Sequence, residues 1–407
     1  MTITLTRGPS VAAPPTARRH RRWPWITLII VGGCLLAAAP TWRNVAVPAL
    51  VKFPTDVDQN PRYEGTFTLF IDPATAAPLA EPAISTLTVD RHVMGLPAES
   101  GSEDVVVEET IAFEVEGLPP ATQVHQYVMD RRTNLNVADG RAWAFEESNV
   151  LDRSGAAWVA MPRDVDSASI VPMFKDEIGA TFTASGTTDT EVVEGLRLIG
   201  FSASDIARPA TEAYLRSLDA VVPLPRSLTF DQLKPSLLAS GLPVDEAIAA
   251  LVAVATPEDV TALAAMTAEP IPLEYVISFS GQTFVEPQTG AIVDVAAVTD
   301  RLSARPTSEA VAPLRAILER YRVEPAIAAV IDGLDTIAAE PLPVFEYRYA
   351  QTQDSADEVG RWVADQRDRM NLAERTIPYA LAIAGGAAVV VGGLLLLRSI
   401  VIDRRNP

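Results

Sequence analysis

The chain has 407 residues, of which 48% are hydrophobic, and it carries a formal net charge of −19. This length suits one large domain or two ordinary ones, and the acidic balance argues against a nucleic-acid partner, since no basic stripe can neutralise phosphates. The single cysteine, Cys34, excludes an intramolecular disulfide framework.

The chain begins with a basic tail and an uncharged segment. Residues 1–22 contain five arginines and no acid, and residues 23–42 carry no charge over about the 20 residues that span a hydrocarbon core. We predict an uncleaved transmembrane helix. A cleaved signal peptide and a lipoprotein signal ending at Cys34 stay open as alternatives, although Pro40 after the small-residue site and the apolar residues after Cys34 disfavour them.

The other end mirrors the first. Residues 377–397 form a second uncharged segment, and residues 398–407 form a second basic tail. The positive-inside rule then predicts that both termini are cytoplasmic and that residues 43–376 form an acidic extracytoplasmic domain. Two Gly-Gly pairs in the second segment would allow a close helix approach, although such residues are also common in membrane spans.

The domain between the segments is rich in predicted strands. Apolar side chains alternate at period two in several runs, which is typical of a half-buried antiparallel sheet. These runs are residues 66–71, 109–115, 192–201, 273–279 and 344–349.

Two Ala- and Leu-rich stretches, residues 204–270 and 302–340, have helical spacing and are predicted as helical insertions. Within the first, Thr256 is a predicted N-cap followed by Pro257 at the first helical position. A last helix is predicted from Ser355, which forms a capping box with Glu358. The predicted fold class is α+β: a β-rich ectodomain with helical insertions between two transmembrane helices.

The most distinctive polar stretch is HQYVMDRRTNLNVADGRAWAF, residues 125–145. Its centre shares a pattern with two other segments: an apolar run, an acid, a threonine three residues later and a further apolar run. The three segments are residues 70–79, 128–137 and 284–293. We predict hairpin corners whose acids, Asp72, Asp130 and Glu286, accept hydrogen bonds across the turn. Asn134 and Gly290 would supply the left-handed residue.

Motifs for metal binding are weak. The histidines are His20, His92 and His125, and with one cysteine they disfavour a zinc site. Asp56, Asp58 and Asn60 have the first spacings of a calcium loop. Pro61 and Phe67 stand where that loop needs glycine and glutamate, so we reject it.

Motifs for catalysis are also weak. The sequence contains neither a G-x-S-x-G elbow nor a phosphate-binding P-loop, and Ser154 in LDRSGAAW is typical of a turn. We therefore predict a non-enzymatic protein without catalytic, cofactor-binding or metal-binding residues and without a cofactor. Its ligand-binding residues and oligomeric state are not specified by the sequence.

Several stretches resemble an actinobacterial cell-envelope family labelled porin PorA. They are residues 47–60, 127–145, 150–162, 193–201 and 284–295. Only three of the 33 basic residues are lysine, a bias typical of GC-rich bacteria such as actinomycetes. The family label implies a channel, but an outer-membrane β-barrel has no spanning helices. By topology alone, the chain is also similar to class B scavenger receptors, which bind lipids in a hydrophobic tunnel.

These observations favour a cell-membrane protein that binds or transfers an envelope lipid or glycolipid. That function requires an apolar cavity large enough for acyl chains. The alternative is an oligomeric, porin-like channel or an envelope-assembly component, and a hydrolase is a third possibility. The expected partners are the lipid bilayer, through the two helices, and a lipid ligand, with no nucleic acid.

Overall fold

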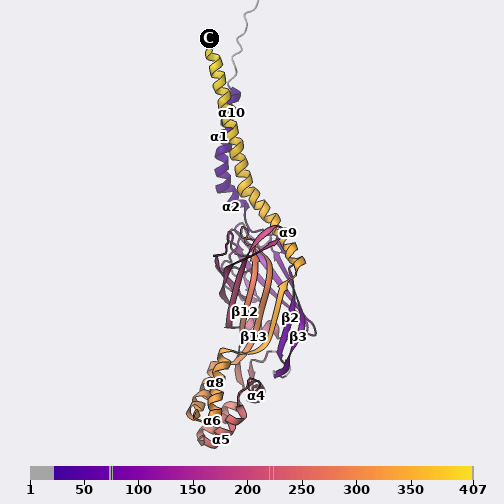
Figure 1. Ribbon diagram of the computed structural model, residues 1–407, viewed down its shortest axis with the longest axis vertical. Coiled ribbons are helices and arrows are strands. Elements are labelled where there is room, and N and C mark those ends of the chain that lie inside the picture. The colour runs from indigo at the N-terminus through magenta and orange to yellow at the C-terminus, as the bar shows by residue number, and fades with distance from the viewer. Residues whose placement is uncertain (1–22, 73–74, 76, 220, 223, 406–407) are drawn as a thin grey trace, which may run out of the picture. The chain divides into compact units, whose positions relative to one another are not determined.

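The computed structural model describes residues 23–72, 75, 77–219, 221–222 and 224–405 (Figure 1). The predicted basic tail at 1–22 lies outside this range, as do the last two residues of the tail at 398–407. The chain divides into two compact units, with boundaries after Val51 and after Asp368. We call residues 23–51 with 369–405 the helix-pair unit, and residues 52–368 the sheet unit.

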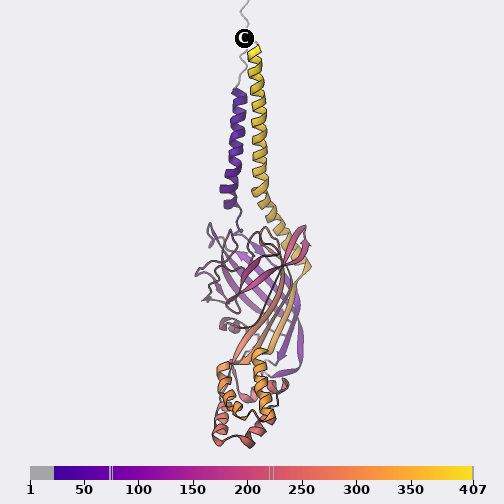
Figure 2. The same cartoon turned by 60° about the vertical axis from the view of Figure 1, so that its left-hand side comes forward.

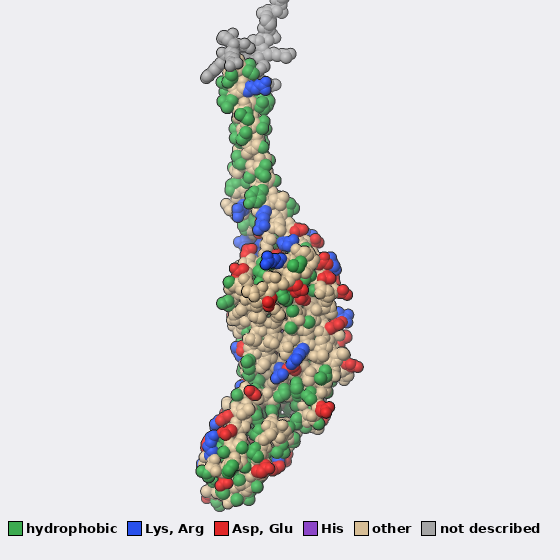
Figure 3. Space-filling view, in the orientation of Figure 1, with side chains coloured by type: hydrophobic (Ala, Val, Ile, Leu, Met, Phe, Trp, Pro, Cys, Tyr) green, Lys and Arg blue, Asp and Glu red, His purple; other side chains and the backbone are tan. Residues whose placement is uncertain are grey.

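The helix-pair unit contains the two uncharged segments. The first forms α1 (Trp23–Thr41), a π-helical turn (Trp42–Ala46) and α2 (Val47–Leu50), and the second forms α10 (Ile377–Arg405) after a second π-helical turn (Leu372–Thr376). Apolar side chains cover most of both helices (Figure 3). Two continuous helices, Trp23–Ala49 and Gln353–Ile402, are long and apolar enough to cross a membrane.

Glycines allow α1 and α10 to pack closely in antiparallel directions. A Cβ atom added to Gly32 would lie 2.7 Å from the carbonyl oxygen of Gly385, and one added to Gly392 would lie 2.9 Å from Cγ1 of Ile29. The neighbouring Gly386 and Gly393 have open space instead. One glycine of each Gly-Gly pair therefore serves the helix contact, as small residues do in membrane helix pairs.

The sheet unit is built on one antiparallel sheet that curves into a half-barrel (Figure 2). The strand order is β7-β6-β5-β4-β3-β2-β14-β13-β12-β10-β9-β8, with β1 on β3 and β11 on β12. The strands are β1 (Asp58–Gln59), β2 (Arg62–Ile71), β3 (Pro78–Gly95), β4 (Asp104–Val115), β5 (Ala121–Asp130), β6 (Trp143–Ala144), β7 (Glu146–Val150), β8 (Ile170–Lys175), β9 (Ala180–Val193), β10 (Leu196–Pro209), β11 (Ser227–Leu228), β12 (Ile271–Val285), β13 (Ile292–Pro306) and β14 (Leu342–Gln351).

The predicted strands are confirmed in four of the five runs, and the α+β class is confirmed as well. The run 192–201 is different, because β9 ends at Val193 and β10 begins at Leu196. Between them, Glu194 and Gly195 have φ values of 48° and 75° and form a two-residue hairpin turn. The prediction of one strand was wrong because the apolar alternation continues on both sides of this short turn.

The helices lie in two insertions. The first contains α3 (Glu212–Leu218), α4 (Phe230–Ala239), α5 (Val244–Val254) and α6 (Pro257–Ala268), and the second contains α7 (Ser308–Leu318), a 3₁₀ turn (Glu319–Tyr321) and α8 (Pro325–Ala339). Figure 1 shows α4, α5, α6 and α8 together at one end of the sheet. Both insertions begin later than the predicted residues 204 and 302, because β10 and β13 extend to Pro209 and Pro306.

Two helix starts test the capping predictions. Thr256 caps α6 as predicted, with its side chain accepting a hydrogen bond from the backbone N–H of Asp259. The last helix, α9 (Gln353–Asn371), begins two residues before the predicted cap at Ser355. The N–H of Ala356 already donates to the Thr352 carbonyl oxygen, so the helix follows β14 directly. Ser355 instead accepts from the backbone N–H of Arg62, at 2.9 Å.

The core of the sheet unit lies inside the curve of the half-barrel. Tyr63, Phe67 and Phe345 pack there against Tyr214 and Leu215 of the short helix α3. At another part of the sheet, the apolar side of α9 packs against β10 and β12 through Val359 and Val363. The strands have one apolar face each, because apolar residues alternate at period two. A single sheet must curve to turn the apolar faces of all its strands toward one interior.

Candidate functional site

The predicted hairpin corners are confirmed where the structure describes them. Oδ1 of Asp130 accepts hydrogen bonds from the backbone N–H groups of Arg132 (2.9 Å) and Thr133 (2.8 Å). Oε2 of Glu286 accepts from the N–H and the hydroxyl of Thr289, both at 2.8 Å. In the first corner Thr75 donates to Asp72 at 2.9 Å, while residues 73, 74 and 76 lie outside the described residues.

Two of these corners contact each other. Asn134 has a φ of 63°, and its side-chain amide donates to the carbonyl oxygens of Met161 (2.9 Å) and Thr289 (2.8 Å). Gly290 has a φ of 76°, and a Cβ atom there would lie 2.1 Å from the Met161 oxygen. The polar stretch that stands out in the sequence therefore joins β5 to the corner between β12 and β13.

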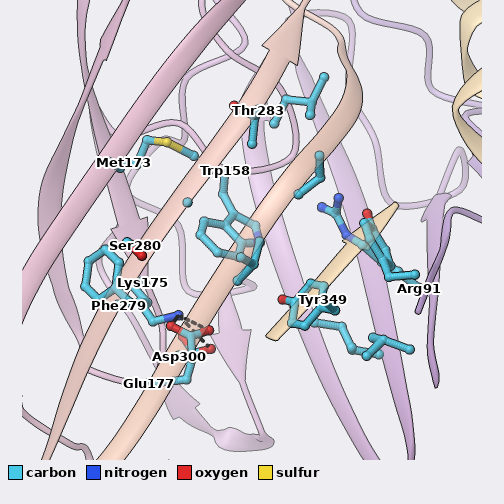
Figure 4. A pocket seen from close by; sticks show the side chains of 18 of the residues that line it. Arg91, Trp158, Met173, Lys175, Glu177, Phe279, Ser280, Thr283, Asp300 and Tyr349 are labelled. Atoms are coloured by element: carbon cyan, nitrogen blue, oxygen red, sulfur yellow. Dashed lines mark hydrogen bonds and ion pairs between the residues drawn. The ribbon is translucent and has the colours of Figure 1, made fainter. Parts of the chain in front are cut away.

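An apolar cavity of about 160 Å³ lies inside the half-barrel (Figure 4). Its walls come from nearly every long strand, β2 to β5 on one side and β8, β9, β10, β12, β13 and β14 on the other. Aromatic side chains provide much of the surface. They are Tyr63, Phe113, Trp158, Phe182, Phe201, Phe279, Tyr347 and Tyr349.

Charged residues interrupt the apolar inner faces of four strands. Arg91 follows Val89 on β3, Glu109 precedes Ile111 on β4, Lys175 follows Met173 on β8 and Asp300 follows Val298 on β13, each at a spacing of two residues. All four line the cavity. Buried charges are expensive unless they are paired, so each of these positions requires a specific partner.

Glu109 is the centre of the first buried charge group. Its Oε1 accepts from Nε of Arg91, and its Oε2 lies 2.8 Å from the Tyr127 hydroxyl and 3.1 Å from Nε1 of Trp158. The carboxylate has no exposed surface. Burial alone would raise the pKa of Glu109, but the charges of Arg91 and His125, with the hydrogen bonds from Tyr127 and Arg91, hold that pKa below its usual value.

Asp176 extends this group below the cavity wall. Nε of the fully buried Arg153 donates to its Oδ1 at 2.7 Å, and its Oδ2 lies 2.8 Å from Nδ1 of His125 and 3.0 Å from the Tyr127 hydroxyl. Burial would lower the pKa of His125. The hydrogen bond and the charge of Asp176, with the charge of Glu109, outweigh burial and raise it.

Lys175 forms the second buried charge group with two carboxylates. Its Nζ lies 3.1 Å from Oδ1 of Asp300 and 3.3 Å from Oε1 of Glu177, and 5.1 Å from the ring centre of Phe279. Figure 4 joins these three charged side chains by dashed lines, with Trp158 beside them in the cavity. One ammonium group is thus shared by two acids.

The other residues considered in the sequence lie outside the cavity. His92 pairs with Asp58 at 2.9 Å on the exposed surface, and Ser154 lies in an exposed turn held by Asp152. Among the described residues, no three or more His, Cys, Asp or Glu side chains are grouped to hold a metal ion.

Sequence reasoning gave no candidate site residues, and the cavity charges were missed. The signal was nevertheless present for the four cavity charges that lie on strands, since each occupies an inward position where an apolar residue is expected. Glu177 follows the end of β8 and had no such signal. Arg153 and Trp158 had no such signal, because they lie in the irregular segment between β7 and β8.

The cavity differs from the one expected for lipid carriage. It is close in size to a cavity of about 150 Å³ that holds one benzene, and below the roughly 300 Å³ at the lower end for drug-sized ligands. A second cavity of about 30 Å³ shares the walls Tyr63, Arg91 and Ile292 and reaches Trp362 on α9. These two cavities therefore have room for part of a chain or a small ring rather than a whole lipid. A more open hollow of about 580 Å³ adjoins the first cavity through Ser202, Ala203, Ser280 and Gly281.

Comparison with known protein families identifies a match over most of the chain. A family model described as Porin PorA matches residues 26–394, which include the whole sheet unit and most of α1 and α10. No curated protein matches the chain. The match also covers the five stretches on which the resemblance to porin PorA rests.

Proposed function

The chain belongs to the Porin PorA family, a family of the membrane or envelope, and we propose that it is a membrane-anchored binding protein. In this proposal the sheet unit holds one apolar chain or ring of an envelope lipid or glycolipid in its cavity. Any further chain of the ligand stays outside, because the volume of about 160 Å³ cannot contain it.

The aromatic cavity is the single observation that supports binding most strongly. Close-packed interiors leave few voids larger than a water molecule, and a void of this size lined by rings loses contacts that a ligand would restore. The surrounding charges are already satisfied by protein partners, so an apolar group can enter without breaking an ion pair.

Mass spectrometry of solvent extracts tests this proposal. The full-length protein is purified in detergent beside a Val298→Trp variant, because Val298 lies on the cavity wall and a larger ring would fill the space. Overpacking costs about 1–3 kcal/mol, so both proteins are first compared for folding. We expect an amphiphile in stoichiometric amount from the wild type alone. Equal recovery from both proteins would refute binding in this cavity.

The proposal includes a topology in which both termini are cytoplasmic and the sheet unit is extracytoplasmic. Its support is the positive-inside rule applied to the two basic tails. Protease added to intact protoplasts should then degrade the sheet unit and spare tags on both tails. A sheet unit that is protected until the cells are lysed would contradict this orientation.

We also propose that the protein acts without catalysis, so an amphiphile incubated with the protein should be recovered chemically unchanged. A channel is the second candidate function, and the description of the family as porins favours it. In that case the helix pair would have to assemble into an oligomeric pore. Conductance steps from the purified full-length protein in a planar bilayer, abolished by a variant in α1 or α10, would establish this candidate instead.

A further inference from the structure

The cavity wall holds one more acid than base. Two bases, Arg91 and Lys175, face three acids, Glu109, Glu177 and Asp300. This balance is unusual for a site expected to bind lipids, because many lipid heads are themselves anionic. The distribution of these charges decides which heads the site tolerates.

Both bases are already occupied by protein carboxylates. Nε of Arg91 donates to Glu109, which is fully buried, so this guanidinium is neutralised at contact distance. Lys175 lies within 3.3 Å of both Glu177 and Asp300. At Lys175, an incoming carboxylate or phosphate would have to displace Glu177 or Asp300 and leave it buried without a counter-charge, which is strongly unfavourable. At Arg91 it would meet a cation whose charge Glu109 already neutralises.

The surplus acid lies at the Lys175 group. Glu177 and Asp300 share one ammonium group, and their side chains are 15% and 7% exposed, so water screens them little. Aromatic faces adjoin these acids, with Tyr347 and Tyr349 on the same wall. A positive charge is attracted both by two carboxylates that share a single ammonium group and by ring faces.

We propose that the cavity selects amphiphiles with a neutral or positively charged head and rejects free carboxylates and phosphates. The inference rests on the proposed binding function and names its ligand class: a single-chain alcohol, sugar or amine rather than a fatty acid or lipid phosphate. The acidic wall acts mainly against the wrong ligand, as like-charge contacts do in other selective sites.

Three probes with the same chain and different heads test the inference: octanol, octyltrimethylammonium and octanoate. Binding to the full-length protein in nanodiscs is measured by isothermal titration at pH 7.5. Val298→Trp in the same nanodiscs gives the blank, because partition of the probes into lipid is common to both samples. We expect octanoate to bind at least roughly tenfold more weakly than the other two, as the repulsion from a low-dielectric carboxylate requires.

A variant that removes one cavity acid gives a second, independent test. Glu177→Gln removes the surplus acid and leaves the Lys175–Asp300 pair intact, so octanoate should bind several-fold more tightly than to the wild type. Glu114→Gln is the matched control, since Glu114 is an exposed acid on β4 that does not line the cavity. Octanoate affinity in this control should equal that of the wild type.

The results distinguish a failure of head-group selection from a failure of cavity binding. If octanoate binds as tightly as octanol, or if Glu177→Gln behaves like Glu114→Gln, head selection is wrong while cavity binding stands. If none of the three probes binds above the Val298→Trp blank, the proposed function itself is wrong.

Discussion

Replacement of Arg153 by methionine is the most direct test of the buried charge groups. The Arg153 side chain has no exposed surface, and its guanidinium donates to Asp176 and to the carbonyl oxygens of Gln126 (2.9 Å) and Trp143 (3.0 Å). It also lies 4.4 Å from the ring centre of Tyr127. Methionine keeps much of the volume but donates no hydrogen bond.

The expected loss follows from these contacts. Removing one partner of a buried ion pair costs about 3–5 kcal/mol, because the remaining charge stays buried. His125 still contacts Asp176, which places the loss at the lower end of this range, while two carbonyl oxygens that each lose a donor add to it. We therefore expect Arg153→Met to lower the free energy of unfolding of the sheet unit by about 4 kcal/mol.

Pulse proteolysis of the full-length protein in a urea series, in detergent, measures this change. Arg197→Met is the matched control, because Arg197 is an exposed residue of β10, and exposed substitutions usually change stability by less than about 0.5 kcal/mol. The Asp176→Asn variant and the double variant complete a cycle, in which we expect a coupling of about 0.5–3 kcal/mol. A loss in Arg153→Met no larger than in the control, or additivity in the cycle, would refute a stabilising role for this ion pair.

Three further predictions concern pH and the hairpin corners. The pKa of His125 is raised in the folded protein, so protonated His125 contributes to stability fully below the unfolded pKa of about 6.5, and this contribution is lost as pH rises through the folded pKa. The free energy of unfolding should therefore fall over this pH range, and it should fall less in His125→Gln. Gly290→Ala should destabilise the sheet unit more than Gly117→Ala in the same urea assay, because both have positive φ but only the first added Cβ meets backbone; equal losses would mean that the corner can shift. Asn134→Gly should keep the left-handed turn and lose two hydrogen bonds, whereas Asn134→Ala should lose both the hydrogen bonds and the preference for the left-handed turn. Asn134→Ala should therefore be less stable than Asn134→Gly by about 1 kcal/mol, and the reverse order would contradict the turn assignment.

The sequence was most informative where one physical pattern dominates. Uncharged segments of membrane-spanning length became α1 and α10, and period-two runs became strands, because burial of apolar surface decides both. Corner chemistry was also predictable, since Asp130 and Asn134 act on residues a few positions away. The turn at Glu194 and the start of α9 were missed, because they depend on strand pairing and not on local composition.

The cavity could not be predicted in this way. Its walls combine strands from both ends of the chain, so Arg91 and Asp300 become neighbours of one interior only after the whole sheet has formed. A single charge within an apolar run was visible at each position, but its partner was not. Which charges pair depends on the order of the strands in the sheet, and the alternation of apolar and polar residues does not specify that order.

The ladder between β2 and β14 has a consequence for biogenesis. Tyr63 pairs with Gln351 and Leu69 with Phe345. This ladder can therefore form only after β14, which is almost the last part of the sheet unit to be synthesised, has become available to β2. Contacts this distant in sequence slow folding, and unpaired strand edges invite aggregation meanwhile. A chain emerging from its N-terminus would thus expose the edge of β2 until synthesis is nearly finished, and truncation before residue 342 would leave the edges of β2 and β13 permanently without their partner β14.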